Sequence, residues 1–122
     1  MSADALTAQD GVQQMMAQAL SSLPWPVSQP PGNLEAETYL TFSEVRGSLY
    51  RASNRTARIH HLVQVHAWTK SGEDRHRTAL FEALELLQAA GAVVVSWGPD
   101  EYERDTGISH IACTVAWNQI PK

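Results

Sequence analysis

Four histidines and the only cysteine are the side chains best suited to metal binding or nucleophilic catalysis: His60, His61, His66, His110 and Cys113. His60 and His66 fall on one face of a predicted strand, but six positions place them roughly 20 Å apart, too far to share an ion. A cross-strand pair of His60 and His110 would lack the acidic or thiolate ligands of a zinc site. We therefore expect no metal site and interpret these histidines as solvent-facing strand residues.

Nucleophilic catalysis is equally poorly supported. Cys113 follows His110 on the last predicted strand, but three positions put the two side chains on opposite faces. Cys113 is instead expected to be a core residue with Ile111 and Val115. The sequence contains no Gly-rich phosphate-binding loop. We expect no catalytic residues, no cofactor-binding residues and no cofactor.

Tyr102, Arg104 and Asp105 form a more informative polar group. Arg104 either pairs with an acidic residue of a neighbouring subunit, or pairs locally with Asp100 or Asp105 and holds its own loop. Both interpretations are compatible with the sequence.

Three tryptophans, Trp68, Trp97 and Trp117, fall at the ends of predicted strands. They form one aromatic patch at an interface, where tryptophan is enriched, or they cap the core. The sequence does not separate these alternatives.

Alternation of apolar and polar residues predicts strands over Thr38–Val45, Ala57–Thr69, Ala92–Trp97 and Ile108–Asn118. Helical spacing predicts a first helix over residues 5–20 and a second that Ser71 or Asp74 caps and Gly91 ends. The order α-β-β-α-β-β predicts an α+β fold: a two-layer sandwich of a mixed four-stranded sheet with the helices on one face.

The proline-rich residues 21–36 are expected to form an extended loop that Trp25 pins to the body. At 122 residues, with 43% hydrophobic and 18% charged residues, we expect one domain over residues 1–122. Residues 1–37 would hold the first helix and this loop. Residues 38–119 would form the β-β-α-β-β core.

The second helix links strands 57–69 and 92–97 in a β-α-β crossover, so these strands should run parallel, with 92–97 in a central position. The loop over residues 46–55 and the loop over residues 98–107 would then lie at opposite ends of the sheet. The first loop carries Arg46, Arg51 and Arg55, whereas the second carries Asp100, Glu101, Glu103 and Asp105 with Arg104. Such a polar body suits stacking between unlike partners or head-to-tail contact, although both loops could equally be ordinary solvated loops.

The net charge of −4 is unevenly distributed, because residues 44–77 carry seven basic and three acidic side chains. An acidic chain is a poor nucleic-acid binder at long range, so no specific nucleic-acid binding is expected. The lone cysteine fits a reducing compartment. No signal peptide or membrane-length apolar stretch is present, so we expect a cytosolic protein without membrane contact.

Residues 63–69 read V-Q-V-H-A-W-T and are followed by Ser71-Gly72 and a helix. Residues 101–105 read E-Y-E-R-D and precede the last strand, H-I-A-C-T-V over residues 110–115. With this outline, the chain over about residues 38–118 resembles the tail terminator, or tail completion, family of long-tailed (siphovirus-type) phages and prophages. The proline-rich stretch 24–31 departs from the family pattern.

The resemblance implies a non-enzymatic virion protein that forms a ring, generally hexameric, at the head-proximal end of the tail. Such a ring caps the tail tube, stops its polymerisation and joins the tail to the head connector. Its partners would be its own copies, the tail tube protein and the head-tail connector or stopper protein, with assembly in the host cytoplasm. The alternative is a small dimeric α+β ligand-binding or enzymatic domain. The candidate interface residues are Arg46, Arg51, Arg55, Arg58, Trp68, Asp100, Tyr102, Glu103, Arg104 and Asp105.

Overall fold

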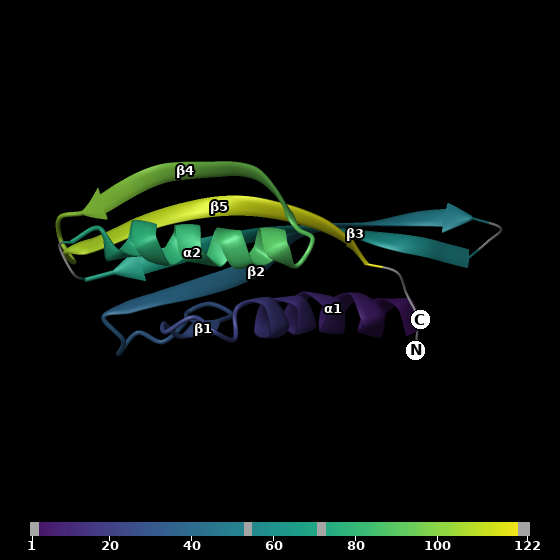
Figure 1. Ribbon diagram of the computed structural model, residues 1–122, viewed down its shortest axis with the longest axis horizontal. Helices are drawn as coiled ribbons and strands as arrows, with labels where there is room; N and C mark the ends of the chain where they lie inside the picture. Colours follow the sequence, from purple (N-terminus) through teal and green to yellow (C-terminus); the bar gives the residue numbers. More distant parts are fainter. Residues whose placement is uncertain (1–2, 53–54, 71–72, 120–122) are drawn as a thin grey trace.

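The computed structural model describes residues 3–52, 55–70 and 73–119, with side chains described outside residues 3–10, 46–52, 55–57 and 119. Two helices and a five-stranded sheet form an α+β fold (Figure 1). In chain order the elements are α1 (Ala3–Ala19), β1 (Val27–Ser28), β2 (Thr38–Ala52), β3 (Arg55–Thr69), α2 (Arg75–Ala89), β4 (Val93–Glu103) and β5 (Ile108–Gln119). Neither helix, over its described length, could cross a membrane.

The strands form one mixed sheet in the order β1-β2-β3-β5-β4. The four long strands pair antiparallel, whereas β1 pairs parallel with β2. The prediction of a four-stranded sheet is therefore wrong by one strand. The missed strand, β1, is two residues long and lies in the proline-rich stretch, where no alternation marks it.

β3 and β4 run in the same direction, as predicted, because both are antiparallel to β5. They do not pair with each other, however, since β5 lies between them: Val63 and Val94 both lie opposite Val115. The β-α-β crossover therefore skips one strand position, and the mixed character of the sheet comes from β1.

The prediction of a central strand over Ala92–Trp97 is wrong. β4 is an edge strand, and it continues to Glu103 through a register shift between Trp97 and Asp100. Its three-valine run is typical of a strand covered on both sides. Here the three valines lie in an edge strand instead, and Val93 is 64% exposed.

The predicted loop over Arg46–Arg55 is wrong as well, because the paired strands extend as far as Ala52 and Arg55. The last rung between β3 and β5 joins Ile59 and Gln119. The β2–β3 hairpin therefore continues past the rest of the sheet as a two-stranded arm (Figure 1). Gly47 indicated a loop, yet it pairs with His61 inside this ladder.

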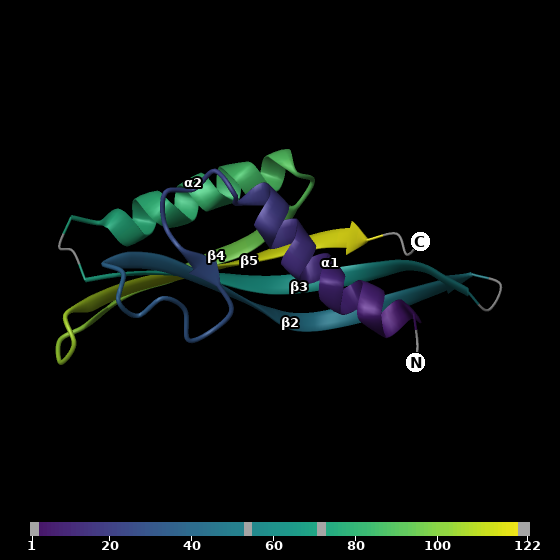
Figure 2. The same cartoon turned by 90° about the horizontal axis from the view of Figure 1, so that it is seen from below.

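Both helices pack on one face of the sheet, as predicted (Figure 2). Their apolar positions join the inward residues of the strands in one buried cluster, which includes Val12, Met16, Leu20, Leu40, Phe42, Val63, Val65, Ala67, Ala79, Leu80, Ala83, Leu84, Leu87, Ile111, Cys113 and Val115. The helical spacing of Leu80, Leu84 and Leu87 is the pattern that places these side chains on the sheet.

α2 ends as the sequence indicates. Gly91 has φ 103°, and the N–H groups of Gly91 and Ala92 donate to the carbonyls of Gln88 and Leu87. This is a Schellman motif, which satisfies the last carbonyls of the helix. Asp74 occupies the N-cap position but makes no side-chain cap hydrogen bond, and Ser71 lies outside the described residues.

The segment between α1 and β2 contacts both faces of the sheet. Trp25 packs against the core, as predicted, and the Leu40 N–H donates to the Pro26 carbonyl. Further along, Gly32 lies so close to the opposite face that an added Cβ would be 2.7 Å from the Thr41 methyl and 2.9 Å from the Tyr39 ring. This contact buries Tyr39 and Thr41 on the face without helices.

Candidate assembly surfaces

The two hairpin tips lie at opposite ends of the sheet, as predicted. β5 begins beside Thr69, at the end of β3, and finishes beside Ile59, near the start of β3. The β4–β5 connection therefore lies at the far end from the β2–β3 arm (Figure 1). The sequence places positive charge at one end and mostly negative charge at the other.

Of the basic candidates, Arg51, Arg55 and Arg58 belong to the arm, whereas Arg46 lies within the sheet, opposite Leu62. Arg46 and Arg51 lie in β2 and Arg55 begins β3, and the side chains of all three are outside the described set. Arg58 lies opposite Tyr50 in the ladder, and its side chain is exposed. Arg46, Arg51 and Arg55 therefore lie in paired strands and not in the predicted loop, whereas Arg58 lies in a strand, as predicted.

The acidic end carries its own hydrogen bonds. Glu103 accepts hydrogen bonds at its carboxylate from the Thr106 hydroxyl, at 3.0 Å, and at its backbone carbonyl from the Gly107 N–H, at 2.8 Å. Tyr102 is 64% exposed, and Arg104 and Asp105 are also exposed. The exposed side chains of this tip are therefore available to a partner.

The side chain of Asp100 is anchored to α2, while its backbone pairs with Ile111 in the β4–β5 hairpin. Its carboxylate accepts hydrogen bonds from His76 Nε2 and from Arg77 Nη1, each at 2.8 Å. Burial raises the pKa of Asp100, but the bonds and charges of His76 and Arg77 outweigh it and lower the pKa overall. Within the described ranges no ion pair joins Arg104 to Asp100 or Asp105, so the local pairing of Arg104 is not seen.

The three tryptophans do not share one patch. Trp68 lies on the face away from the helices and donates from Nε1 to the Thr41 hydroxyl at 3.2 Å. Trp97 meets Phe81 edge-on, with ring centroids 5.7 Å apart, and Trp117 packs on His61 at 5.1 Å.

On the face without helices, which we call the open face, Trp68 belongs to a row of stacked rings with Tyr39, His66 and His110. The centroids of Trp68 and His110 are 3.9 Å apart, and those of Tyr39 and Trp68 are 6.3 Å apart. His66 Nδ1 lies 2.6 Å from His110 Nε2, so one of these nitrogens carries the shared hydrogen. We name these four residues the ring row.

His60 and His110 are not cross-strand partners, because the register places His110 opposite Trp68. His60 Nδ1 is instead 3.0 Å from Asn118 Oδ1. In the described part of the chain, no three potential ligands gather as a metal site would need.

Not every histidine faces solvent. His61 is fully buried on the core side and forms a hydrogen bond with the Glu44 carboxylate. Its position between Ile59 and Val63 on the apolar face was the signal for burial. Cys113 is also buried, as predicted, and burial raises the pKa of its thiol to about 12, which leaves it unreactive.

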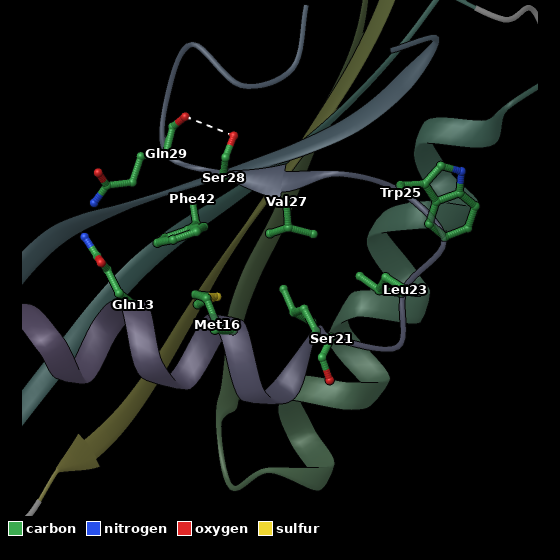
Figure 3. A pocket seen from close by; sticks show the side chains of 11 residues that line it. Gln13, Met16, Ser21, Leu23, Trp25, Val27, Ser28, Gln29 and Phe42 are labelled. Atoms are coloured by element: carbon green, nitrogen blue, oxygen red, sulfur yellow. Dashed lines mark hydrogen bonds between the residues drawn. The ribbon is translucent and has the colours of Figure 1, made fainter.

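A cavity of about 560 Å³ lies between α1, β1 and the segment that joins them. Figure 3 shows Met16, Trp25, Val27 and Phe42 around it, with Gln13, Ser28 and Gln29 toward its polar side. Its lining contains no ionisable side chain, so it offers space for an apolar group but no acid or base that would activate the hydroxyls of Ser21 and Ser28.

Comparison with known proteins gives little beyond this geometry. No protein-family model matches the chain, and no curated protein sequence matches it. Among solved structures, a chain from the virion of a native gene transfer agent particle has a TM-score of 0.45 and 16% sequence identity, with 91% of this chain and 92% of that chain covered. A likeness at this level defines no class of protein for this chain.

Proposed function

We propose that this protein is a non-enzymatic tail terminator that forms a ring, generally of six copies, at the head-proximal end of a phage tail tube. One face of the ring meets the tube protein, and the other meets the head-tail connector. The observation that carries the proposal is the separation of the basic β2–β3 tip from the acidic β4–β5 tip at opposite ends of one sheet. A ring of equally oriented copies with the strands along its axis then has two unlike faces.

The sequence resemblance to tail terminators supports the same function, and the mechanism is geometric. A ring that matches the tube on one side and differs from it on the other ends polymerisation. Charge complementarity at each face selects the partner and its orientation. No step requires a cofactor, metal or nucleophile.

Charge reversal in the arm tests this proposal. Arg51→Glu with Arg55→Glu should leave the fold intact, because both positions lie on the arm beyond the last β3–β5 rung. Joining of tails to heads should fail, since the face then carries the wrong charge. Arg75→Glu is the control: its side chain is 55% exposed on α2, and it should join heads normally. Normal joining by the arm variant would contradict the proposal.

The second candidate is a small dimeric ligand-binding or enzymatic domain, which the 560 Å³ cavity favours. The absence of ionisable lining residues leaves apolar ligand binding as the more suitable form of this candidate. The mass of the assembled particle separates the two functions: six copies support the ring and two copies support the dimer.

A further inference from the structure

The outer edge of β4 is divided into two unlike halves. Its first half, Val93–Trp97, which we name the apolar half-edge, is strongly exposed: Val93 is 64%, Val95 58% and Trp97 54% exposed. An exposed apolar edge strand is a template for pairing with another strand. The structure shows no strand paired on this side of β4 in the described chain.

The second half of β4 is protected against such pairing. Pro99 has no N–H to donate, and the register shifts between Trp97 and Asp100. Glu101 and Glu103 add negative charge. Natural sheets use these devices to prevent association at an edge. The apolar half-edge shares one of these devices, a register shift between Val94 and Ser96, but it contains no proline and no charged residue. Its exposed side chains therefore remain suited to an apolar contact.

The opposite edge of the sheet offers a matching segment. β1 covers only Leu40 and Thr41 of β2, and beyond them the outer side of β2 has no partner strand among the described residues. Val45 lies on this stretch, at the register shift between Glu44 and Arg46, and is 55% exposed. Both edges of the sheet thus expose valines.

The two apolar segments lie at the same height in the sheet. One row of partners runs from Glu44 through Val63 and Val115 to Val94. The next row runs from Arg46 to Val93 in the same way. Val45, between these rows on β2, is therefore level with the start of the apolar half-edge on β4.

Strand direction fits a second copy in the same orientation. Directions alternate across β2, β3, β5 and β4, so β4 is antiparallel to β2. A copy placed beside β4 without being turned over therefore presents an antiparallel β2, and the alternation continues from one subunit to the next. A two-fold contact between two β4 edges would leave β2 uncovered.

Rigidity of the half-edge also favours such a contact. Trp97 is held by the Phe81 ring and lies 5.8 Å from the Arg77 guanidinium, so an interface could use it without ordering it further.

We propose that the apolar half-edge of β4 pairs with the outer edge of β2 around Val45 in a second copy of this chain. The contact is head-to-tail, so repeated copies close into a ring if the rotation permits. This inference rests on the proposed ring function and assigns its subunit interface to two named edges.

Two single variants test the contact. Val95→Lys blocks the β4 edge and Val45→Lys blocks the β2 edge, and both side chains are exposed. Val93→Lys provides a second variant of the β4 edge, and Gln88→Lys, on the exposed side of α2, is the matched control. Native mass spectrometry measures the oligomers up to a protein concentration of about 1 mM.

Wild type and Gln88→Lys should form the same oligomers of more than two copies. Each edge variant alone should weaken association by at least about tenfold. An equal mixture of Val45→Lys and Val95→Lys should form a heterodimer, because each variant retains the edge that the other has lost. This recovery also shows that both variants are folded.

The proposal is wrong if wild type remains monomeric, if Val45→Lys assembles like wild type, or if the mixture forms no heterodimer. Its failure is distinguishable from failure of the proposed function. If the variants form the expected heterodimer but the wild-type oligomers do not bind tail tubes, only the proposed terminator function is contradicted. Normal capping of tubes by both edge variants would remove only the edge contact.

Discussion

His66 and His110 are close enough that protonating both would place two positive charges side by side, with ring nitrogens 2.6 Å apart. Burial lowers the pKa of His66, and the neighbouring His110 lowers it further. Burial also lowers the pKa of His110, against the opposing effect of Glu101 and Glu103. Both imidazoles therefore resist protonation in the folded protein.

This pair predicts a loss of stability on acidification. The folded pKa values are below the ordinary 6.5, so the unfolded chain binds more protons as the pH falls through this range. The contribution of the pair is complete above about pH 6.5 and decreases below it. Urea unfolding at about pH 7.5 and about pH 5.5 should show a lower midpoint in acid. His66→Gln with His110→Gln should reduce the difference; an unchanged difference would count against this role.

Asp100 connects β4 to the start of α2, so its removal should destabilise the protein. Asp100→Ala leaves His76, which is only 3% exposed, without a partner at Nε2, and its Nδ1 already has none. A buried polar group left unsatisfied costs about 1–3 kcal/mol. Urea denaturation should show a loss of this size, whereas Asp105→Ala, at an exposed position, should change stability little. Equal losses would contradict the anchoring role.

At the level of elements, substitutions at two glycines with positive φ distinguish the cost of backbone conformation from the cost of a steric clash. Gly91 has φ 103° and an added Cβ would meet nothing within 4 Å, while Gly32 has φ 83° and an added Cβ would meet Thr41 at 2.7 Å. Gly91→Ala should cost about 1–2 kcal/mol in unfolding free energy, from backbone conformation alone. Gly32→Ala should lose more, because the loop must also move off Tyr39. Equal losses would show that this loop does not pack closely on the open face.

The elements themselves were largely predictable, but their neighbours were not. Alternation identified β3 and β5, and the leucine spacing identified α2, because these patterns reflect burial on one side. A run of valines such as that of β4 occurs both in a central strand and in an exposed edge strand, so the sequence does not distinguish the two positions. The register that places His110 beside His66 depends on hairpin geometry and not on local pattern, so the sequence did not indicate this pair.

Predictability of the candidate surfaces follows the same division. The opposite placement of the basic and acidic tips required only the directions of β3 and β4, which the α2 crossover indicates. To predict the exposure of the apolar half-edge, and its alignment with Val45 across the sheet, the strand order and the register would have been needed. The anchoring of Asp100 by His76 required a contact between elements that are distant in sequence, and no local signal pointed to it.

For the whole molecule, the central claim is that identical copies stand side by side in one orientation, with all basic arms on one face. Imaging of purified protein bound to tail tubes tests this claim directly by electron microscopy. We expect one ring at one end of each tube, with every β2–β3 arm directed to the same side. Bare tube ends, or two-fold pairs with arms on both sides, would contradict it.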